Sequence, residues 1–270
     1  MESKRRCAAF AGAAFSFLLI AIAFAEEWQG YERLTREQLL GRLAEAGTEP
    51  PSLSGKNFSG LDLSGIDFRR ANLSASVFNK AALSGARLDG CNLTVSFLEG
   101  ANLSEASLTR ATLFSAQMAG AVLTGADLTG ARLIGDLRRA DLSHAKLVQM
   151  NAAADMKNQS MGLMRTSIVN AKALSADMTD SDFSRADLSF SDFTGARMIG
   201  TKLVRADFSG SVLAGVDLTG ADLRDAILID ADLTNANLSK ANLTGAQLRG
   251  VKGLSSARRP DTVGLATTDR

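Results

Sequence analysis

Few side chains in this sequence have the types and spacing that chemistry requires. His144 is the only histidine of the chain, and no serine or cysteine is marked by a motif as its nucleophile, so we interpret it as a solvated surface residue. Phosphate-binding, zinc and calcium loop motifs are also missing from the sequence. We therefore predict no catalytic residue, no cofactor and no metal, and we expect a protein that is not an enzyme.

Methionines give a weaker chemical candidate. Residues 150–164 contain four of the eight methionines, namely Met150, Met156, Met161 and Met164. In an exported protein their thioethers could bind Cu(I). The favoured interpretation is that flexible methionines fill a poorly repeating stretch of the core.

The elements that position these residues follow a period of five. Residues 231–248 read ADLTNANLSKANLTGAQL, and Leu, Phe or Met recurs at every fifth position in two blocks, 17 centres from Leu53 to Leu133 and 15 from Met178 to Leu248. A small residue precedes most centres by two positions, and residues two apart on a strand point to the same side. Each unit is therefore expected to be a short strand and a bend, with Leu and Phe inside and the residue between them outside.

These units resemble those of the pentapeptide-repeat family, whose unit reads A-(D/N)-L-x-x. The match covers about residues 52–252. The resemblance implies an all-β fold, a right-handed quadrilateral β-helix with four units in each coil. About ten coils would form a rod on the order of 48 Å long, because paired strands lie about 4.8 Å apart.

The repeat loses its register once. The centre after Leu133 is Leu137, which implies a one-residue deletion, and residues 150–170 are degenerate. Within them, residues 154–156 and 166–168 are candidate units. Because the original register returns by Met178, we favour one continuous helix with a local bulge or loop, the alternative being two stacked domains.

The ends of the stack are expected to differ from the repeats, since a repeat array needs caps. Thr35 and Gln38 form a capping-box pattern, and Leu39, Leu40 and Leu43 make an apolar stripe. This predicts a capping helix at about residues 36–46 over the first coil.

Two aromatic residues precede the predicted helix. We expect Trp28 and Tyr31 to pack around the cap, with ligand stacking as the alternative. At the other end, residues 253–270 are predicted to be a flexible tail.

The N-terminus has the pattern of an export signal. Basic residues 4–6 precede the apolar run 7–25, and Ala23-Phe24-Ala25 is a small-x-small cleavage signal. The alternative is an uncleaved anchor facing outward, which is the only way in which we expect the chain to contact a membrane. We assign residues 1–25 to the signal, 26–51 to the N-terminal segment with the helix and 52–252 to the β-helix.

The predicted mature chain begins at Glu26 and lies in the periplasm or outside the cell. It has 27 basic and 28 acidic residues, a net charge of −1, which argues against nucleic-acid binding. Its single cysteine, Cys91, leaves it without an internal disulfide.

Asp187 and Asp207 are a candidate carboxylate pair. They are four units apart and should stack on adjacent coils, where like charges could raise a pKa or hold a cation. Because aspartate is common at this position of the repeat, we favour hydrogen bonds to nearby backbone instead.

One group of outward positions is apolar where polar residues are the rule. Val95, Phe97 and Phe114 occupy such positions, and with four units in each coil Val77 lies one coil below Phe97. The four residues are predicted to form one exposed patch that binds a protein, since such patches often mark interaction sites. Packing of these side chains against the adjacent corner is the alternative.

These observations favour an exported, non-enzymatic scaffold that binds an unknown protein or envelope component, or a second copy of itself as a homodimer. The alternative comes from members of the resembled family that mimic DNA and bind gyrase. That role needs a strongly acidic face and a cytoplasmic location, whereas residues 175–250 have 11 Asp against 7 Lys and Arg.

Overall fold

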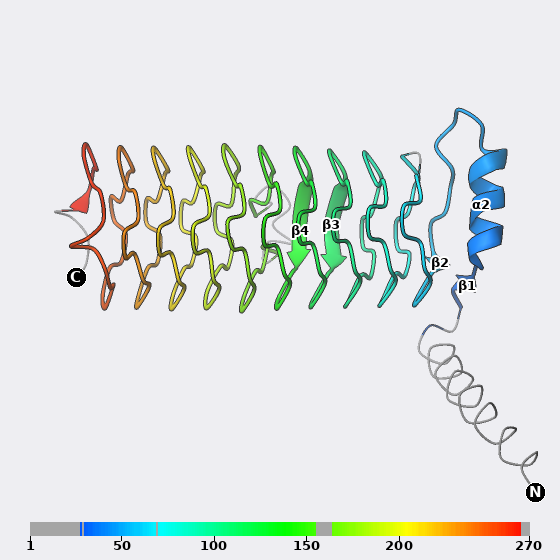
Figure 1. The fold of residues 1–270 in the computed structure, drawn as a ribbon, viewed down its shortest axis with the longest axis horizontal. Coiled ribbons are helices and arrows are strands. Elements are labelled where there is room, and N and C mark those ends of the chain that lie inside the picture. Colours follow the sequence, from blue (N-terminus) through cyan, green and yellow to red (C-terminus); the bar gives the residue numbers. More distant parts are fainter. Residues whose placement is uncertain (1–27, 29, 69, 155–163, 266–270) are drawn as a thin grey trace, which may run out of the picture.

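The computed structural model describes residue 28 and residues 30–68, 70–154 and 164–265. Over these residues the backbone winds into a continuous coil, with one helix beside its first turn (Figure 1). The predicted export signal, residues 1–25, lies outside the described residues.

Each coil pairs with the next through parallel backbone hydrogen bonds. Ser52 pairs with Asn72 and Asn72 with Asn92, and this spacing of four units recurs along the coil. The N–H of Leu53, for example, donates to the carbonyl of Asn72 over 2.8 Å. Nearly every fifth residue has a left-handed φ, such as Gly220 at 68° and Lys240 at 61°. Each coil therefore has four corners and four sides.

Most sides are too short to form more than an isolated bridge. Strand β2 spans Lys56–Asn57, and the two longest strands, β3 at Thr112–Gln117 and β4 at Arg132–Asp136, lie where the repeat loses its register. Strand β3 pairs in parallel with β4, and the register shifts by one residue at Gly135.

Gly135 explains how the shift is accommodated. A Cβ atom there would lie 2.3 Å from the carbonyl oxygen of Ala116, a distance that no side chain tolerates. The deletion predicted after Leu133 is thus confirmed, and it depends on glycine at this position.

The inside of the coil is the predicted column of large apolar residues. All 17 centres from Leu53 to Leu133 and all 15 from Met178 to Leu248 are buried, and so is the small residue that precedes most of them. Phenylalanines on successive coils stack, with the rings of Phe58 and Phe78 4.8 Å apart. The predicted inside–outside assignment is confirmed.

Several small inner residues are polar, and their hydroxyl groups find partners inside the coil. Ser76 donates to the carbonyl of Leu53 and Ser211 to that of Leu188, both over 2.8 Å. Cys91 takes the same kind of position, where burial raises the pKa of its thiol to about 12. It therefore packs as a small apolar residue and is protonated at neutral pH.

The coil continues through the irregular stretch. Asp136 pairs with Ser167, Asp141 with Lys172 and Asn151 with Asp182, each eleven positions beyond the usual spacing. Eleven residues are thus inserted at one corner, and the spacing of four units returns from Ser167 onward. Residues 166–168 form a unit as predicted, whereas the candidate unit 154–156 lies partly outside the described residues.

The chain before the first coil forms a strand and a helix. Strand β1, Glu32–Arg33, pairs in parallel with β2, and helix α2 spans Arg36–Glu45. Thr35 accepts from the N–H of Gln38 over 3.2 Å, while the Gln38 side chain accepts from the N–H of Thr35 over 2.8 Å. This reciprocal pair begins the helix at the predicted residue.

Helix α2 and the residues before it contact the first coil closely. Leu39 and Leu43 are buried in the same core as the coil. Three carbonyls of the first coil accept hydrogen bonds from this segment: Asn57 from the N–H of Leu34, Ser59 from Arg33 and Asp62 from Arg36.

An ion-pair link joins the helix to the coil. The carboxylate of Glu32 lies 2.6 Å from both the Lys56 ammonium and the Arg42 guanidinium. The hydrogen bonds from Lys56 and then Arg42 hold the pKa of Glu32 below its ordinary value.

The predicted flexible tail after residue 252 is wrong for residues 253–263. Arg258 pairs with Asn237 and Val263 with Asn242, each one position beyond the usual spacing. One residue is inserted near Gly253, and the coil then continues. Because the inserted residue ends the spacing of five, the sequence pattern did not reveal these additional units. Their backbone nevertheless pairs with the preceding coil.

Candidate interaction surface

The four predicted patch residues lie together at one corner, but they are not equally exposed. Val95 is 45% exposed, Phe97 and Phe114 are half-buried, and Val77 is fully buried. The predicted exposure of Val77 is therefore wrong. We use the name corner patch for Val95, Phe97 and Phe114 from here on.

The segment that contains Trp28 packs on the patch, which the repeat pattern did not predict. Its ring lies 4.7 Å from that of Phe97 and 5.6 Å from that of Tyr31, while Glu32 pairs with Lys56 two coils earlier. The segment from Trp28 to Glu32 therefore crosses the coil that contains Val77. Trp28 packs as expected, but its main partner is Phe97 and not helix α2.

Phe114 extends the corner patch along the coil. The N–H of Val95 donates to the carbonyl of Phe114 over 2.7 Å, so the two residues are neighbours on adjacent coils. Phe114 pairs in turn with Ile134, which is buried. The patch thus meets a buried outward residue at one end and is open at Val95.

Phe190 is an exposed aromatic residue that the sequence-based prediction missed. It is 63% exposed and occupies a corner with φ 56°, where its ring lies across Gly210 of the next coil. It stands two positions after Leu188, the same corner position that identified Val95. Applying that rule to the second block of repeats would have found it.

The other chemical candidates have structural roles where they are described. His144 is exposed at a corner, as expected, and Met150 is buried in the core. Met164 lies beside Ser115, with the hydroxyl oxygen and the sulfur 3.6 Å apart. Met156 and Met161 lie outside the described residues, so the four methionines cannot be placed as a group.

Asp187 and Asp207 stack on adjacent coils as predicted, and both bond nearby backbone. Asp207 accepts from the Ser209 N–H over 2.9 Å and from its hydroxyl over 2.6 Å. Asp187 accepts equivalent bonds from the N–H of Ser189 over 3.3 Å and from its hydroxyl over 2.7 Å. It also forms an ion pair with Arg165 at 2.8 Å. Such local bonds fix the bend that follows each strand.

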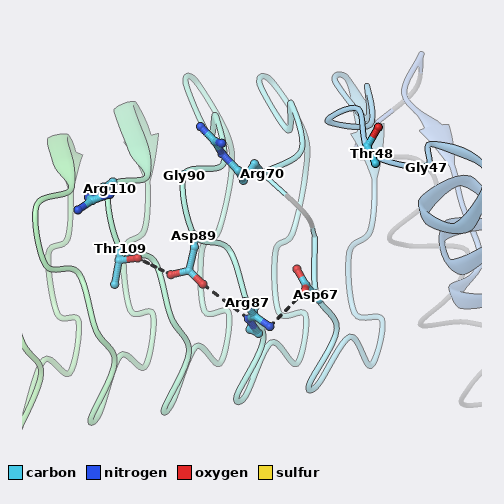
Figure 2. A pocket seen from close by; sticks show the side chains of 9 residues that line it. All are labelled: Gly47, Thr48, Asp67, Arg70, Arg87, Asp89, Gly90, Thr109 and Arg110. Atoms are coloured by element: carbon cyan, nitrogen blue, oxygen red, sulfur yellow. Dashed lines mark hydrogen bonds and ion pairs between the residues drawn. The ribbon is translucent and has the colours of Figure 1, made fainter.

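A polar groove lies near the N-terminal end of the coil. It has a volume of about 640 Å³ and is lined by Gly47, Thr48, Asp67, Arg70, Arg87, Asp89, Gly90, Thr109 and Arg110. Figure 2 shows Arg70, Gly90 and Arg110 on successive coils, with the aspartates and Arg87 beside them. The loop after helix α2 contributes Gly47 and Thr48 at one end. No sequence motif marked this groove, although Arg70 and Arg110 are two coil lengths apart.

The two carboxylates of the groove already have partners. Arg87 lies 3.4 Å from Asp67 and 3.8 Å from Asp89. Asp89 also accepts from the hydroxyl groups of Ser107 and Thr109. Burial alone would raise the pKa of Asp89, but these hydrogen bonds and the charge of Arg87 hold it below its ordinary value.

The described residues contain neither a cluster of metal ligands nor a membrane-spanning helix. Among residues 28, 30–68, 70–154 and 164–265, no three His, Cys, Asp or Glu side chains gather as metal ligands. Helix α2 has 10 residues, and no helix in this part of the chain has the length and apolarity to cross a membrane.

Comparisons with known proteins agree on the repeat. The family described as pentapeptide repeats matches in eight copies, over residues 57–94, 98–130, 163–198, 191–228 and 217–252. No curated protein sequence matches the chain.

Among solved structures, that of HetL is 31% identical and has a TM-score of 0.59, covering 84% of this chain and 98% of HetL. HetL is a pentapeptide repeat protein involved in heterocyst differentiation regulation in the cyanobacterium Nostoc sp. strain PCC 7120. The repeat match and the likeness to HetL show that the coil is a right-handed β-helix.

Two further solved structures are less similar. Rfr23 from the cyanobacterium Cyanothece 51142 is 24% identical, with a TM-score of 0.23, over 48% of this chain and 63% of Rfr23. Full-length QnrB1, a plasmid-mediated fluoroquinolone resistance protein, is 18% identical, with a TM-score of 0.37, over 73% of this chain and 92% of QnrB1.

Proposed function

The chain belongs to the pentapeptide-repeat family, and from this premise we propose that it is an exported, non-enzymatic scaffold that binds another protein through its corner patch. The observation that carries the proposal is the exposure of Val95 beside Phe97 and Phe114 on a coil whose backbone is paired on both sides. A partner would bury apolar surface without requiring the coil to rearrange.

The composition of the patch supports a protein partner. Aromatic residues are enriched in the centres of protein interfaces, because they bury a large area with little loss of side-chain freedom. Trp28 lies against Phe97 at the edge of the patch and widens the aromatic surface. Outward positions on neighbouring sides carry mostly polar and charged residues, as expected of a polar rim.

Helix α2 is proposed to close the N-terminal end of the coil. An open end would expose unpaired backbone groups, which invite pairing with other chains. The bonds from Leu34, Arg33 and Arg36 to three coil carbonyls support this role. Binding would then be directed to the side of the rod and not to this end.

Export is proposed from the sequence that precedes Glu26. The described fold begins at Trp28, and Trp28 is held by Phe97. Cleavage after Ala25 would therefore leave every described contact in place.

The charge distribution on two sides of the described coil argues against DNA mimicry. On one side of the coil Asp182, Lys202 and Asp222 alternate, and on another Asp177, Arg197 and Asp217 do the same. Such alternation does not reproduce the continuous negative charge of a DNA backbone.

A photo-crosslinking amino acid at Val95 tests the binding surface in cells that express the full chain. The matched control places the same amino acid at Val212, which is 37% exposed on another side of the coil. We expect a discrete crosslinked species from position 95 only, and we expect Phe97→Ser with Phe114→Ser to abolish it. A species with the mass of two chains would identify the partner as a second copy.

Equal crosslinking from both positions, or none from position 95, would contradict the proposed surface. Unfolding of the double variant, measured by circular dichroism, would show that the two phenylalanines serve packing instead. Fractionation with N-terminal sequencing tests export separately, since recovery of an intact Met1 chain from the soluble cytoplasm would contradict it.

A further inference from the structure

We propose that two copies of the chain pair in opposite directions through one side of the coil, which we call the charged side. Its ten outward residues lie on successive paired coils, and each is at least partly exposed: Asp67, Arg87, Ser107, Asp127, Lys146, Asp177, Arg197, Asp217, Asn237 and Arg258. Phe97 lies two sides away from Ser107 on the same coil, so the corner patch is on the opposite face. The inference therefore goes beyond the proposed function and does not depend on it.

The charged side is an even row. The deletion at Gly135 and the eleven inserted residues lie at a corner that does not border it, so Asp127, Lys146 and Asp177 stay on successive coils. Neighbouring positions are about 4.8 Å apart, and the coils stack in a straight row (Figure 1). A second rod can therefore lie along the whole length of this side.

The order of charges is complementary to its own reverse. When the midpoint of an antiparallel pair lies between Lys146 and Asp177, every charge faces an opposite charge or a neutral residue of the second copy. Each contact occurs twice, because the pair has a two-fold axis. The oppositely charged contacts are Lys146 with Asp177, Asp127 with Arg197, and Asp67 with Arg258, and the others are Arg87 with Asn237 and Ser107 with Asp217.

Other arrangements bring like charges together. In a symmetric parallel pair each residue faces itself, so Asp177 would face Asp177. In an antiparallel pair shifted by one coil toward the C-terminus, Lys146 would face Arg197. Since like charges across an interface cost affinity, the order of charges selects one direction and one register.

A corner that borders the charged side agrees with this register. Arg70 and Asp261 occupy it on the first and last of the ten coils, and Asp89 and Lys240 lie one coil further in. The antiparallel pair brings Arg70 to Asp261 and Asp89 to Lys240. Two rows of charge therefore support the same arrangement.

Alternating charges could instead serve the coil itself, because opposite charges on neighbouring strands attract. Arg87 does pair with Asp67 of the preceding coil, at 3.4 Å. Within the part of the chain that the structure describes, however, four central residues of this side form no ion pair within 4.0 Å, namely Asp127, Lys146, Asp177 and Arg197. Asp177 accepts hydrogen bonds from the N–H and hydroxyl of Thr179 over 3.1 and 2.6 Å, which hold its carboxylate in place and leave its charge uncancelled.

The size of the charged side indicates a weak dimer. Its ten positions span about 43 Å, and three extended residues between corners give a width of about 10 Å. Two copies would bury on the order of 900 Å² in total, as in weak and transient complexes. We therefore expect a dimer that depends on charge and dissociates in salt.

Sedimentation velocity of the purified full chain tests the pairing. We expect a dimer in about 0.01 M salt and a monomer in about 1 M salt, where charges interact over only about 3 Å. Lys146→Asp and Asp177→Lys should each raise the dissociation constant at least tenfold, because each places like charges at two symmetric contacts. An equal mixture of the two variants should dimerise again, since opposite charges then face each other across the mixed pair.

The matched controls are Lys172→Asp and Asp192→Lys, the same charge changes on adjacent coils of the next side. Each control should dimerise as the unmodified chain does, and so should Phe97→Ser with Phe114→Ser, which separates this test from that of the corner patch. Circular dichroism verifies that the variants are folded. If a central variant is unfolded, Asp127→Lys and Arg197→Asp repeat the test at the next contact.

Three results would overturn the proposal. The first is a monomer at both salt concentrations. The second is a dimer that neither Lys146→Asp nor Asp177→Lys weakens. The third is equal weakening by the controls, which would make the effect one of net charge and not of the charged side.

Discussion

The side of the coil that begins at Asn57 carries apolar residues in two adjacent early coils and aspartates in two adjacent later ones. Val77 and Phe97 occupy the outward position early, and Asp187 and Asp207 occupy the same position later. The aspartates accept hydrogen bonds from the backbone two residues on, and so they complete the bend that follows them. The apolar side chains accept none, and the ring of Trp28 packs against that of Phe97 instead.

The difference shows how one backbone supports two kinds of surface. An aspartate at the outward position is already engaged by its own chain, so little of its bonding capacity remains for a partner. A phenylalanine at that position contributes little to the bend, and its apolar area stays available to another molecule. Surface of the first kind maintains the coil, and surface of the second kind is suited to recognition.

Both regions should depend equally on the core beneath them, and the largest expected effect tests this. Leu98 follows Phe97 and Leu188 follows Asp187, and both are fully buried. Leu98→Ala and Leu188→Ala should each lower the free energy of unfolding by about 2–5 kcal/mol, because each leaves a cavity. Urea unfolding measures the loss.

Gln247→Ala is the control on the same side, and because Gln247 is exposed it should cost about 0.5 kcal/mol or less. If one leucine variant lost as little free energy of unfolding as this control, the two regions would not depend equally on the core beneath them.

Removing the cover of the apolar region should have the next largest effect. Trp28→Ala is expected to lower the free energy of unfolding by about 2 kcal/mol, less than for a fully buried tryptophan because Trp28 is half-buried. Combined with Phe97→Ala in a double-mutant cycle, it should give a coupling of about 1 kcal/mol. Additive losses would mean that the ring contact does not stabilise the fold.

In the acidic region the expected effects are smaller. Asp207→Ala removes the acceptor for the N–H and hydroxyl of Ser209, and it should cost about 1 kcal/mol. Asp207→Asn should cost much less, since Asn242 accepts the same pair of bonds from Thr244. Equal thermal unfolding of the two variants would show that the charge, and not the acceptor, matters.

The smallest expected effect concerns pH. Hydrogen bonds from the hydroxyl and then the N–H of Thr234 hold the pKa of Asp232 below its ordinary value of 3.8. The unfolded chain therefore takes up this proton first, so the contribution to stability is present above 3.8 and is lost as pH falls below it.

Because the Asp232 side chain is partly exposed to solvent, we expect no more than about 0.5 kcal/mol after solvent screening. Melting temperatures of the unmodified chain and Asp232→Asn, measured from pH 7 to pH 3, should differ in slope at the acid end. Parallel profiles would contradict the prediction.

The core of this fold could be predicted from sequence because the repeat itself encodes it. An uninterrupted column such as Leu218, Leu223 and Leu228 identifies the inner positions without any knowledge of long-range contacts. Helix α2 was predictable for a similar reason, since its capping box and apolar stripe are local. The deletion at Gly135 was visible as a change in spacing.

The contacts that could not be predicted from the sequence are those that the repeat does not encode. Trp28 precedes the repeats, so no period places it against Phe97, and the repeat pattern therefore predicts an exposed Val77. The groove needs Arg70 and Arg110 from alternate coils, together with a loop from outside them. The ordered residues 253–263 were hidden because one inserted residue ends the period of five.

The pairing of Asp136 with Ser167 has a consequence for protein engineering. A loop roughly half as long again as the usual coil costs only about 0.4 kcal/mol of additional loop entropy, because this cost grows with the logarithm of length. Foreign sequence added between residues 154 and 164 should therefore lower the stability of the coil very little. The corner is a natural site for grafting a peptide or a reporter domain, with a stiff rod to hold it at a fixed distance from helix α2.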